Sequence, residues 1–277
     1  MRLYVSCDME GTAGVCSWMQ CNPENNNEYP VYRRYMTQEV RAAVEGAREG
    51  GATEFLINDS HWDMRNLLWD ELPPDVRMIS GSRKPYSMTE GLSREDAGTF
   101  FTGYHARAGA MNGALAHTYT AETIYEVRIN GIACSEALLN AGMAGYYGIP
   151  VLLISGDRTI VEETQQHLPW VRGVIVKESI GHYSADSMTP SAAQAAIRAG
   201  AKQAMTDRGK AKPFTFDGPV TMELETARVE NADFIELMPG FERSGGRTVR
   251  FGHNDYCTVF RAFCAAFRLG GAANAVA

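Results

Sequence analysis

The sequence lacks an apolar run long enough to cross a membrane. The longest such run, near Ile149 to Ile154, falls far short of the roughly 18 residues that a spanning helix needs. A signal-peptide pattern is also missing, because Asp8 and Glu10 stand where the apolar part of the signal would be. We therefore expect a cytoplasmic protein that has no contact with a membrane.

Basic residues are fewer than acidic residues. The chain of 277 residues has 26 Lys and Arg against 33 Asp and Glu, a formal net charge of -7. Binding to nucleic acid requires clustered Lys and Arg to meet the phosphates, so we expect no nucleic-acid partner. The length and the 45% hydrophobic content are those of a globular protein with a full core.

Several familiar catalytic and binding motifs are absent. None of the six cysteines lies in a Cys-x-x-Cys pair, which argues against a zinc knuckle or a thioredoxin-type site, and we expect reduced thiols. The sequence has no Gly-x-Ser-x-Gly elbow, Walker A loop or His-Glu-x-x-His helix. A dinucleotide site has no support either, because Gly-x-Gly-x-x-Gly is missing.

The order of the predicted elements indicates an α/β fold. Short apolar runs that predict buried strands alternate with amphipathic segments that predict helices, as in a mostly parallel sheet flanked by helices. One helix is predicted over Thr37 to Glu49, with Thr37 as its cap and Glu39 in its first turn. Asn130-Gly131 predicts a hairpin. We expect a catalytic domain over 1–212 and a smaller C-terminal α+β lobe over 213–277.

The first predicted strand, from Leu3, leads into two acidic residues. Because side chains alternate along a strand, Asp8 and Glu10 are expected to point the same way, and Cys7 to point to the opposite face, towards the core. Two adjacent carboxylates repel each other unless one is protonated or a cation lies between them. Both could also be solvated at a loop tip, so the case for a metal depends on further ligands.

Other metal-capable side chains follow later strands. His61 comes after the strand Glu54 to Asn58, and His105 directly follows Phe100 to Tyr104. The carboxyl ends of parallel strands meet at one edge of a sheet, where ligands bind, so these side chains are expected near Asp8 and Glu10. Glu136 begins a predicted helix, where the helix dipole alone would explain a carboxylate, although it could also point at the same site.

Three carboxylates and two imidazoles suit borderline divalent metals, zinc first. Five ligands exceed the needs of one tetrahedral ion and suit two ions that share a carboxylate. From these residues alone, a two-metal phosphoesterase fits almost as well as a peptidase.

Matching stretches over almost the whole chain then point to a family. They are YVSCDMEGTAG, LINDSHWDMRNL, ISGSRKPYSMTEGL, FTGYHARAG, SEALLNAGMAGYYGIPVLLISGD and ELMPG. In these the chain resembles the D-aminopeptidases of the dipeptide-operon type, the M55 metallopeptidases. The resemblance implies two Zn2+ per chain, held by Asp8, Glu10, His61, His105 and Glu136 with Asp8 as the bridge, and it implies that His117 is catalytic.

The resemblance also implies the activity and the assembly. The protein is expected to hydrolyse short peptides with an N-terminal D-residue, such as D-Ala-D-Ala, and to form a ring-like homo-oligomer, a decamer, around its active sites. A non-catalytic dipeptide-binding component of an uptake system is the alternative from another class. The missing export signal and the complete ligand set count against it.

Overall fold

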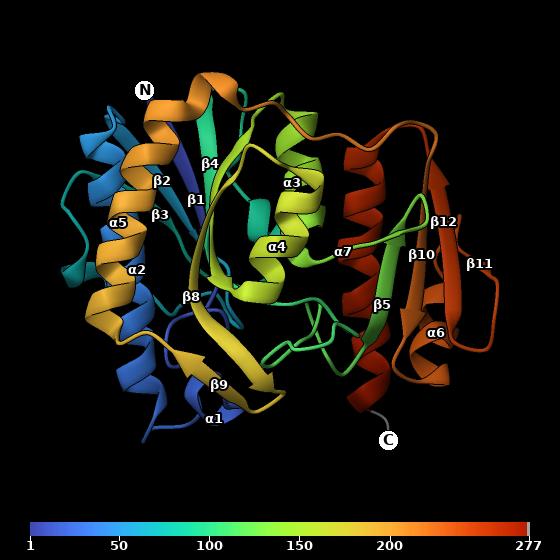
Figure 1. Cartoon of the computed structure of the whole chain (residues 1–277). Helices are drawn as coiled ribbons and strands as arrows, with labels where there is room; N and C mark the ends of the chain where they lie inside the picture. Colours follow the sequence, from blue (N-terminus) through green and yellow to red (C-terminus); the bar gives the residue numbers. More distant parts are fainter. Residues whose placement is uncertain (276–277) are drawn as a thin grey trace.

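The computed structural model describes residues 1–275 of the chain, which form two β-sheets and seven α-helices (Figure 1). The helices are α1 (Trp18–Cys21), α2 (Tyr29–Glu49), α3 (Glu136–Tyr146), α4 (Arg158–His167), α5 (Pro190–Asp207), α6 (Val229–Glu236) and α7 (Tyr256–Ala272). The strands of the larger sheet are β1 (Arg2–Cys7), β2 (Glu54–Asp59), β3 (Val76–Ile79), β4 (Asp96–Tyr104), β7 (Val151–Asp157), β8 (Arg172–Gly181) and β9 (Ser184–Ser187). Those of the smaller sheet are β5 (Ile124–Ile129), β6 (Ile132–Ala133), β10 (Val220–Thr226), β11 (Glu242–Arg243) and β12 (Thr248–His253). Within 1–275, no helix has the length and apolar character that a membrane crossing would require.

The larger sheet runs in the order β3-β2-β1-β4-β7-β8-β9. All neighbouring strands are parallel except β9, which pairs antiparallel with β8. After β1 the chain builds β2 and β3 on one side, then crosses to β4 and continues to the other side. The order therefore reverses between β1 and β4, and ligands bind at the carboxyl edge of such a reversal.

Helices cover both faces of this sheet. α2 and α5 lie side by side on one face, while α3 and α4 lie on the other (Figure 1). Leu3, Val5 and Cys7 of β1 join the core under α2 and α5, whereas Tyr4 joins the core on the opposite face. The predicted placement of Cys7 in the core, away from the acidic site, is confirmed.

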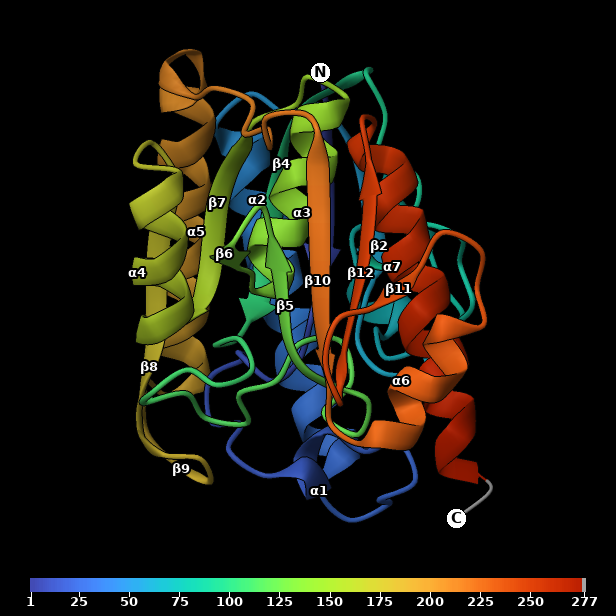
Figure 2. The ribbon, with the colours of Figure 1, turned by 90° about the vertical axis from the view of Figure 1, so that its right-hand side faces the viewer.

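The smaller sheet runs β11-β12-β10-β5-β6 and is antiparallel. It shares one apolar core with α3 and α7 (Figure 2). Asn130 and Gly131, at φ +51° and +80°, make the predicted hairpin turn between β5 and β6. The α/β class with a smaller lobe is confirmed. The boundary at residue 212 stays a prediction, and the smaller sheet pairs 124–133 with strands beyond it.

The helix predicted to begin at Thr37 is longer than expected, and Thr37 is not its cap. α2 begins at Tyr29, and Pro30 suits its first turn because that position needs no N–H donor. The Thr37 hydroxyl instead donates to the carbonyl of Arg33 within the helix, at 2.8 Å. Glu39 is consequently buried in mid-helix, where it accepts a hydrogen bond from the Ala13 N–H at 2.9 Å.

Candidate metal centre

Strand alternation, applied to the sequence, treated the two acids as part of the first strand. In the structure they follow that strand and do not lie on it. β1 ends at Cys7, and the Asp8 N–H that follows donates a hydrogen bond to the carbonyl of Thr102 at 2.8 Å. A turn then brings the Thr12 N–H to the carbonyl of Met9 at 2.9 Å. Asp8 and Glu10 still reach the same cavity, and both are almost completely buried. Their convergence comes from this turn, so strand alternation was the wrong reason for it.

Two glycines allow the ends of β1 and β4 to meet. A Cβ at Gly11 would lie 1.8 Å from the carbonyl oxygen of Tyr104, and one at Gly103 would lie 2.2 Å from that of Asp8. Gly103 also has φ +68°, which side chains disfavour. The closeness of the two backbones positions Asp8 within reach of the histidine that follows β4.

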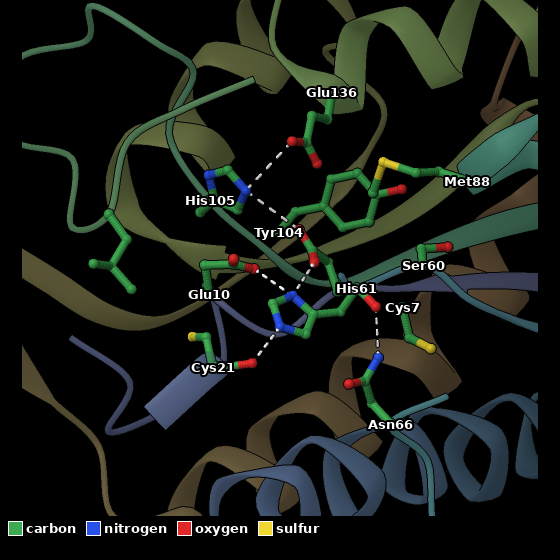
Figure 3. Close-up of polar contacts among 12 residues, drawn as sticks. Cys7, Glu10, Cys21, Ser60, His61, Asn66, Met88, Tyr104, His105 and Glu136 are labelled. Carbon is green, nitrogen blue, oxygen red and sulfur yellow. Dashed lines mark hydrogen bonds and ion pairs between the residues drawn. The ribbon is translucent and has the colours of Figure 1, made fainter. Parts of the chain in front are cut away.

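Asp8 lies between two imidazoles. Its Oδ1 is 3.3 Å from Nδ1 of His61, and its Oδ2 is 3.3 Å from Nε2 of His105. Glu10 Oε2 lies 2.9 Å from the same nitrogen of His61, and Glu136 Oε1 lies 3.6 Å from that of His105 (Figure 3). The structure thus brings together the five residues predicted from strand and helix ends.

His117 joins this cluster from the loop after β4. Its ring stacks on that of His105, with centroids 4.3 Å apart and planes at 3°. Nε2 of His117 lies 3.9 Å from Glu10 Oε1 and 4.0 Å from Glu136 Oε1. Trp18 of α1 packs edge-on against the ring at 5.2 Å. His117 is therefore a buried member of the site and not a surface histidine.

Main-chain carbonyls orient all three imidazoles. The partners are Cys21 for His61 Nε2 (2.9 Å), Ala106 for His105 Nδ1 (3.0 Å) and Leu115 for His117 Nδ1 (2.9 Å). A carbonyl only accepts, so each of these nitrogens carries a proton, and the other nitrogen of each ring is the one that faces the carboxylates. Histidines that bind metals are commonly fixed in this way.

The charges in the cluster favour a bound cation. Burial opposes charge on His61 and His105, yet the facing carboxylates raise the pKa of His61 well above its usual value and that of His105 to about 10. Burial raises the pKa of Glu136 to about 8, whereas contacts with both histidines lower the pKa of Asp8. Burial and the neighbouring His105 lower the pKa of His117 to about 4. Positive charge is thus stabilised between the carboxylates.

Two buried ionisable residues support the loop after Asp8, and the sequence reading missed their role. Lys177 Nζ donates to the carbonyls of Glu10, Thr12 and Val15. Glu39 holds the same loop from α2 through the Ala13 N–H. A lysine at the end of the apolar run 173–176 was the one sequence signal for Lys177.

The cluster lines a cavity of about 1020 Å³ that is walled by both lobes. Its walls include Trp18, Trp62 and Met88, together with Phe267 near the end of α7. Pockets for small ligands commonly have about 300–1,000 Å³, so the volume suits a short peptide better than a folded protein.

The residues present fit a metal. Three buried polar atoms of the cluster, Asp8 Oδ2, Glu10 Oε2 and His105 Nε2, have no hydrogen-bond partner among the described residues. Potential ligand atoms of Asp8, Glu10 and His105 lie within 4.8 Å of one another, as do those of His105, His117 and Glu136. Buried carboxylates and imidazoles at the carboxyl edge of a parallel sheet are the donor set of metal-dependent hydrolases.

Comparison with known proteins agrees with this class. The model of the M55 peptidase family, described as D-aminopeptidase, matches residues 1–265. A D-aminopeptidase of Bacillus subtilis (strain 168) is 35% identical over 266 residues, which cover 95% of each chain. The chain belongs to the M55 family of D-aminopeptidases, which confirms the family and the peptide-hydrolase class expected from the sequence.

A solved structure agrees equally well. It is that of the Zn-dependent D-aminopeptidase DppA from Bacillus subtilis, described as a self-compartmentalizing protease. The two chains superpose with a TM-score of 0.94 at 33% identity, over 98% of each. The α/β architecture is therefore shared across nearly the full length of both proteins.

Proposed function

We propose that this protein is a zinc-dependent D-aminopeptidase that removes the N-terminal D-residue from short peptides such as D-Ala-D-Ala. Its family and the zinc dependence of DppA support the activity and the metal. The observation that carries the proposal is the set of three carboxylates and three carbonyl-anchored imidazoles around one peptide-sized cavity.

The proposed ligand set divides between two zinc ions. Asp8 presents one oxygen to His61 and the other to His105, so it is the ligand that both ions would share. Glu10 would complete the set around His61, and Glu136 the set around His105. When bound, such a pair polarises a carbonyl oxygen and lowers the pKa of a water molecule.

His117 is the proposed catalytic base. Since Nδ1 donates to Leu115, Nε2 is the nitrogen that can accept a proton from the attacking water and return it to the departing amine. Stacking on His105 and contact with Trp18 hold the ring in place for both transfers. The carbonyl anchor thus favours proton transfer over direct donation to an oxyanion by the neutral ring.

The activity is tested by incubating zinc-loaded protein with D-Ala-D-Ala and, separately, with L-Ala-L-Ala, and by measuring released alanine. We expect release from the D-peptide, loss of release after chelation, and recovery on adding zinc. Hydrolysis of the L-peptide alone would overturn the D-selectivity. Recovery of intact D-peptide after long incubation would indicate mere binding. If the protein cleaved a phosphodiester offered as a separate substrate and left the peptide intact, it would be a phosphoesterase.

We further propose a ring-like homo-oligomer, a decamer, that encloses the active sites. The description of DppA as self-compartmentalizing supports an assembly of this kind. The β8–β9 hairpin also carries Ile180 and Tyr183, which are 73% and 63% exposed in the single chain and offer apolar contact area. Light scattering should give the mass of a decamer of the 30.4 kDa chain. A monomeric mass at working concentration would contradict the assembly.

A further inference from the structure

One wall of the cavity carries charge of the opposite sign to the carboxylates of the metal centre. Arg83 and Lys84, from the segment between β3 and β4, line it together with Arg268 of α7. Within residues 1–275, none of these three cations is in an ion pair with a carboxylate, whereas Asp63 of the same cavity is paired with Arg65. The other acid outside the metal centre, Glu122, is exposed. The patch formed by Arg83, Lys84 and Arg268, here called the cationic wall, is available to an anion.

Hydrogen bonds place the cationic wall beside the metal centre. Lys84 is only 8% exposed, and its Nζ donates to Asn58 Oδ1 and to the carbonyl of Asp59, the latter at 2.6 Å. Asp59 ends β2 and precedes His61 by two residues. An ammonium has three donors, so one N–H of this buried Lys84 is left for a ligand.

Arg268 is hydrogen-bonded to the segment that contains Lys84 and has further N–H donors that are not used in these bonds. It donates to the carbonyl of Cys264 at 2.9 Å and to that of Lys84 at 3.0 Å. A guanidinium has five N–H donors in a planar fork that matches a carboxylate. Its position over the ring of Phe267, at 4.9 Å, restricts the side chain further. The half-buried Arg268 is therefore held at the cavity with its remaining donors free for an anion.

Backbone strain also concentrates around this cavity. Arg83 has φ +64°, a conformation that costs a residue with a side chain free energy. Among residues 1–275, the other residues that line the cavity with positive φ and a side chain are Trp62, Met64, Ser87 and Tyr119. Strain of this kind is typical of walls shaped for a ligand.

We infer that the cationic wall binds the free C-terminal carboxylate of the peptide, with Arg268 as its main contact. This inference rests on the proposed aminopeptidase function. A short peptide carries its carboxylate at most about 3.5 Å per residue beyond the bond that is cut, so an anion site beside the metal centre suits peptides of very few residues. The enzyme would then select for short peptides by their far end as well as for a D-residue at their near end.

The test compares D-Ala-D-Ala with its C-terminal amide, which has the same scissile bond without the negative charge. We expect kcat/KM of the wild-type enzyme to be about 10- to 100-fold higher for the acid, as loss of a charged hydrogen bond predicts. Arg268→Gln should lose most of that ratio by lowering kcat/KM for the acid, and Arg268→Lys should restore part of it. Arg261→Gln, an exposed arginine of the same helix, is the matched control and should keep the ratio.

Each outcome separates the inference from the function beneath it. If the wild type hydrolyses neither peptide, the proposed activity fails. Equal hydrolysis of acid and amide would overturn the carboxylate site while leaving the activity intact. If Arg268→Gln lowers both substrates equally, the residue only holds Lys84 and α7 together, and the inference is likewise overturned.

Discussion

Asp8→Ala is expected to lose both zinc ions and all measurable peptidase activity. In the structure, the two oxygens of Asp8 each face a different imidazole, at 3.3 Å from His61 and 3.3 Å from His105. On the proposed assignment one substitution therefore removes a ligand from both ions. Glu10 and Glu136 would each be left with a single imidazole on their side, too few ligands for a closed zinc site. Metal content per chain after dialysis measures the loss.

The control for this variant is Asp63→Ala. Asp63 is a carboxylate of the same cavity, but its partner is Arg65 and it lies outside the cluster. It should retain two ions per chain. If Asp8→Ala also bound two ions with wild-type affinity, Asp8 would not be the bridging ligand. Loss of one ion alone would assign it to a single metal.

His117→Ala is expected to keep its fold and both ions while losing most of its turnover. Five other side chains already supply the proposed ligands, and His117 Nε2 is 3.9 Å or more from the carboxylates it faces. Loss of a positioned general base typically lowers the rate about 10²- to 10⁴-fold. The fall should appear in kcat with a smaller change in KM, because the imidazole would act on protons and not hold the peptide. Steady-state kinetics tests the expected loss of turnover, and metal analysis of the same sample tests whether both ions are retained.

His182→Ala provides the matched comparison. His182 lies on the β8–β9 hairpin, where its ring is 6.5 Å from that of Trp18, the residue that also contacts His117. It is exposed and should leave turnover near normal. Metal loss in His117→Ala would make His117 a ligand, which its closeness to His105 and Glu136 permits. Turnover near normal would reduce it to a packing residue.

The sequence predicted those residues of the site whose local pattern and position in the sheet topology both point to the same edge. Strands followed within one or two residues by Asp8, His61 or His105 imply one shared edge in a parallel sheet, and no precise strand boundary was needed. His117 was different, because its loop gives no periodic signal and its place depends on stacking against His105. From the residues alone it was barely distinguishable from a surface histidine, and only the family resemblance marked it out.

The support of the site was harder to predict than its ligands. Lys177 acts on a loop more than 160 residues earlier, through carbonyl groups that every residue possesses. No side-chain pattern encodes such a contact. The start of α2 was missed because Thr37 has the chemistry of a cap, whereas Pro30 and the burial of Tyr29 determine the boundary. The smaller sheet depends on pairing between β5 and β10, a choice of partner that strand patterns leave open.

The side chains of the proposed metal centre are far apart in the sequence, and this separation affects when metal ions could bind during folding. Its side chains come from positions 8 to 136, and they meet only when β1, β2 and β4 are paired and α3 has docked. In the unfolded chain an ion would find Asp8 and Glu10 as its nearest neighbouring ligands in sequence, and the closure of long loops opposes recruiting the rest. On the proposed assignment, the ions would therefore bind after the chain has folded. On the same assignment, the metal-free fold would have to withstand the mutual repulsion of the clustered carboxylates, with Lys177 and the protonated rings of His61 and His105 supplying positive charge.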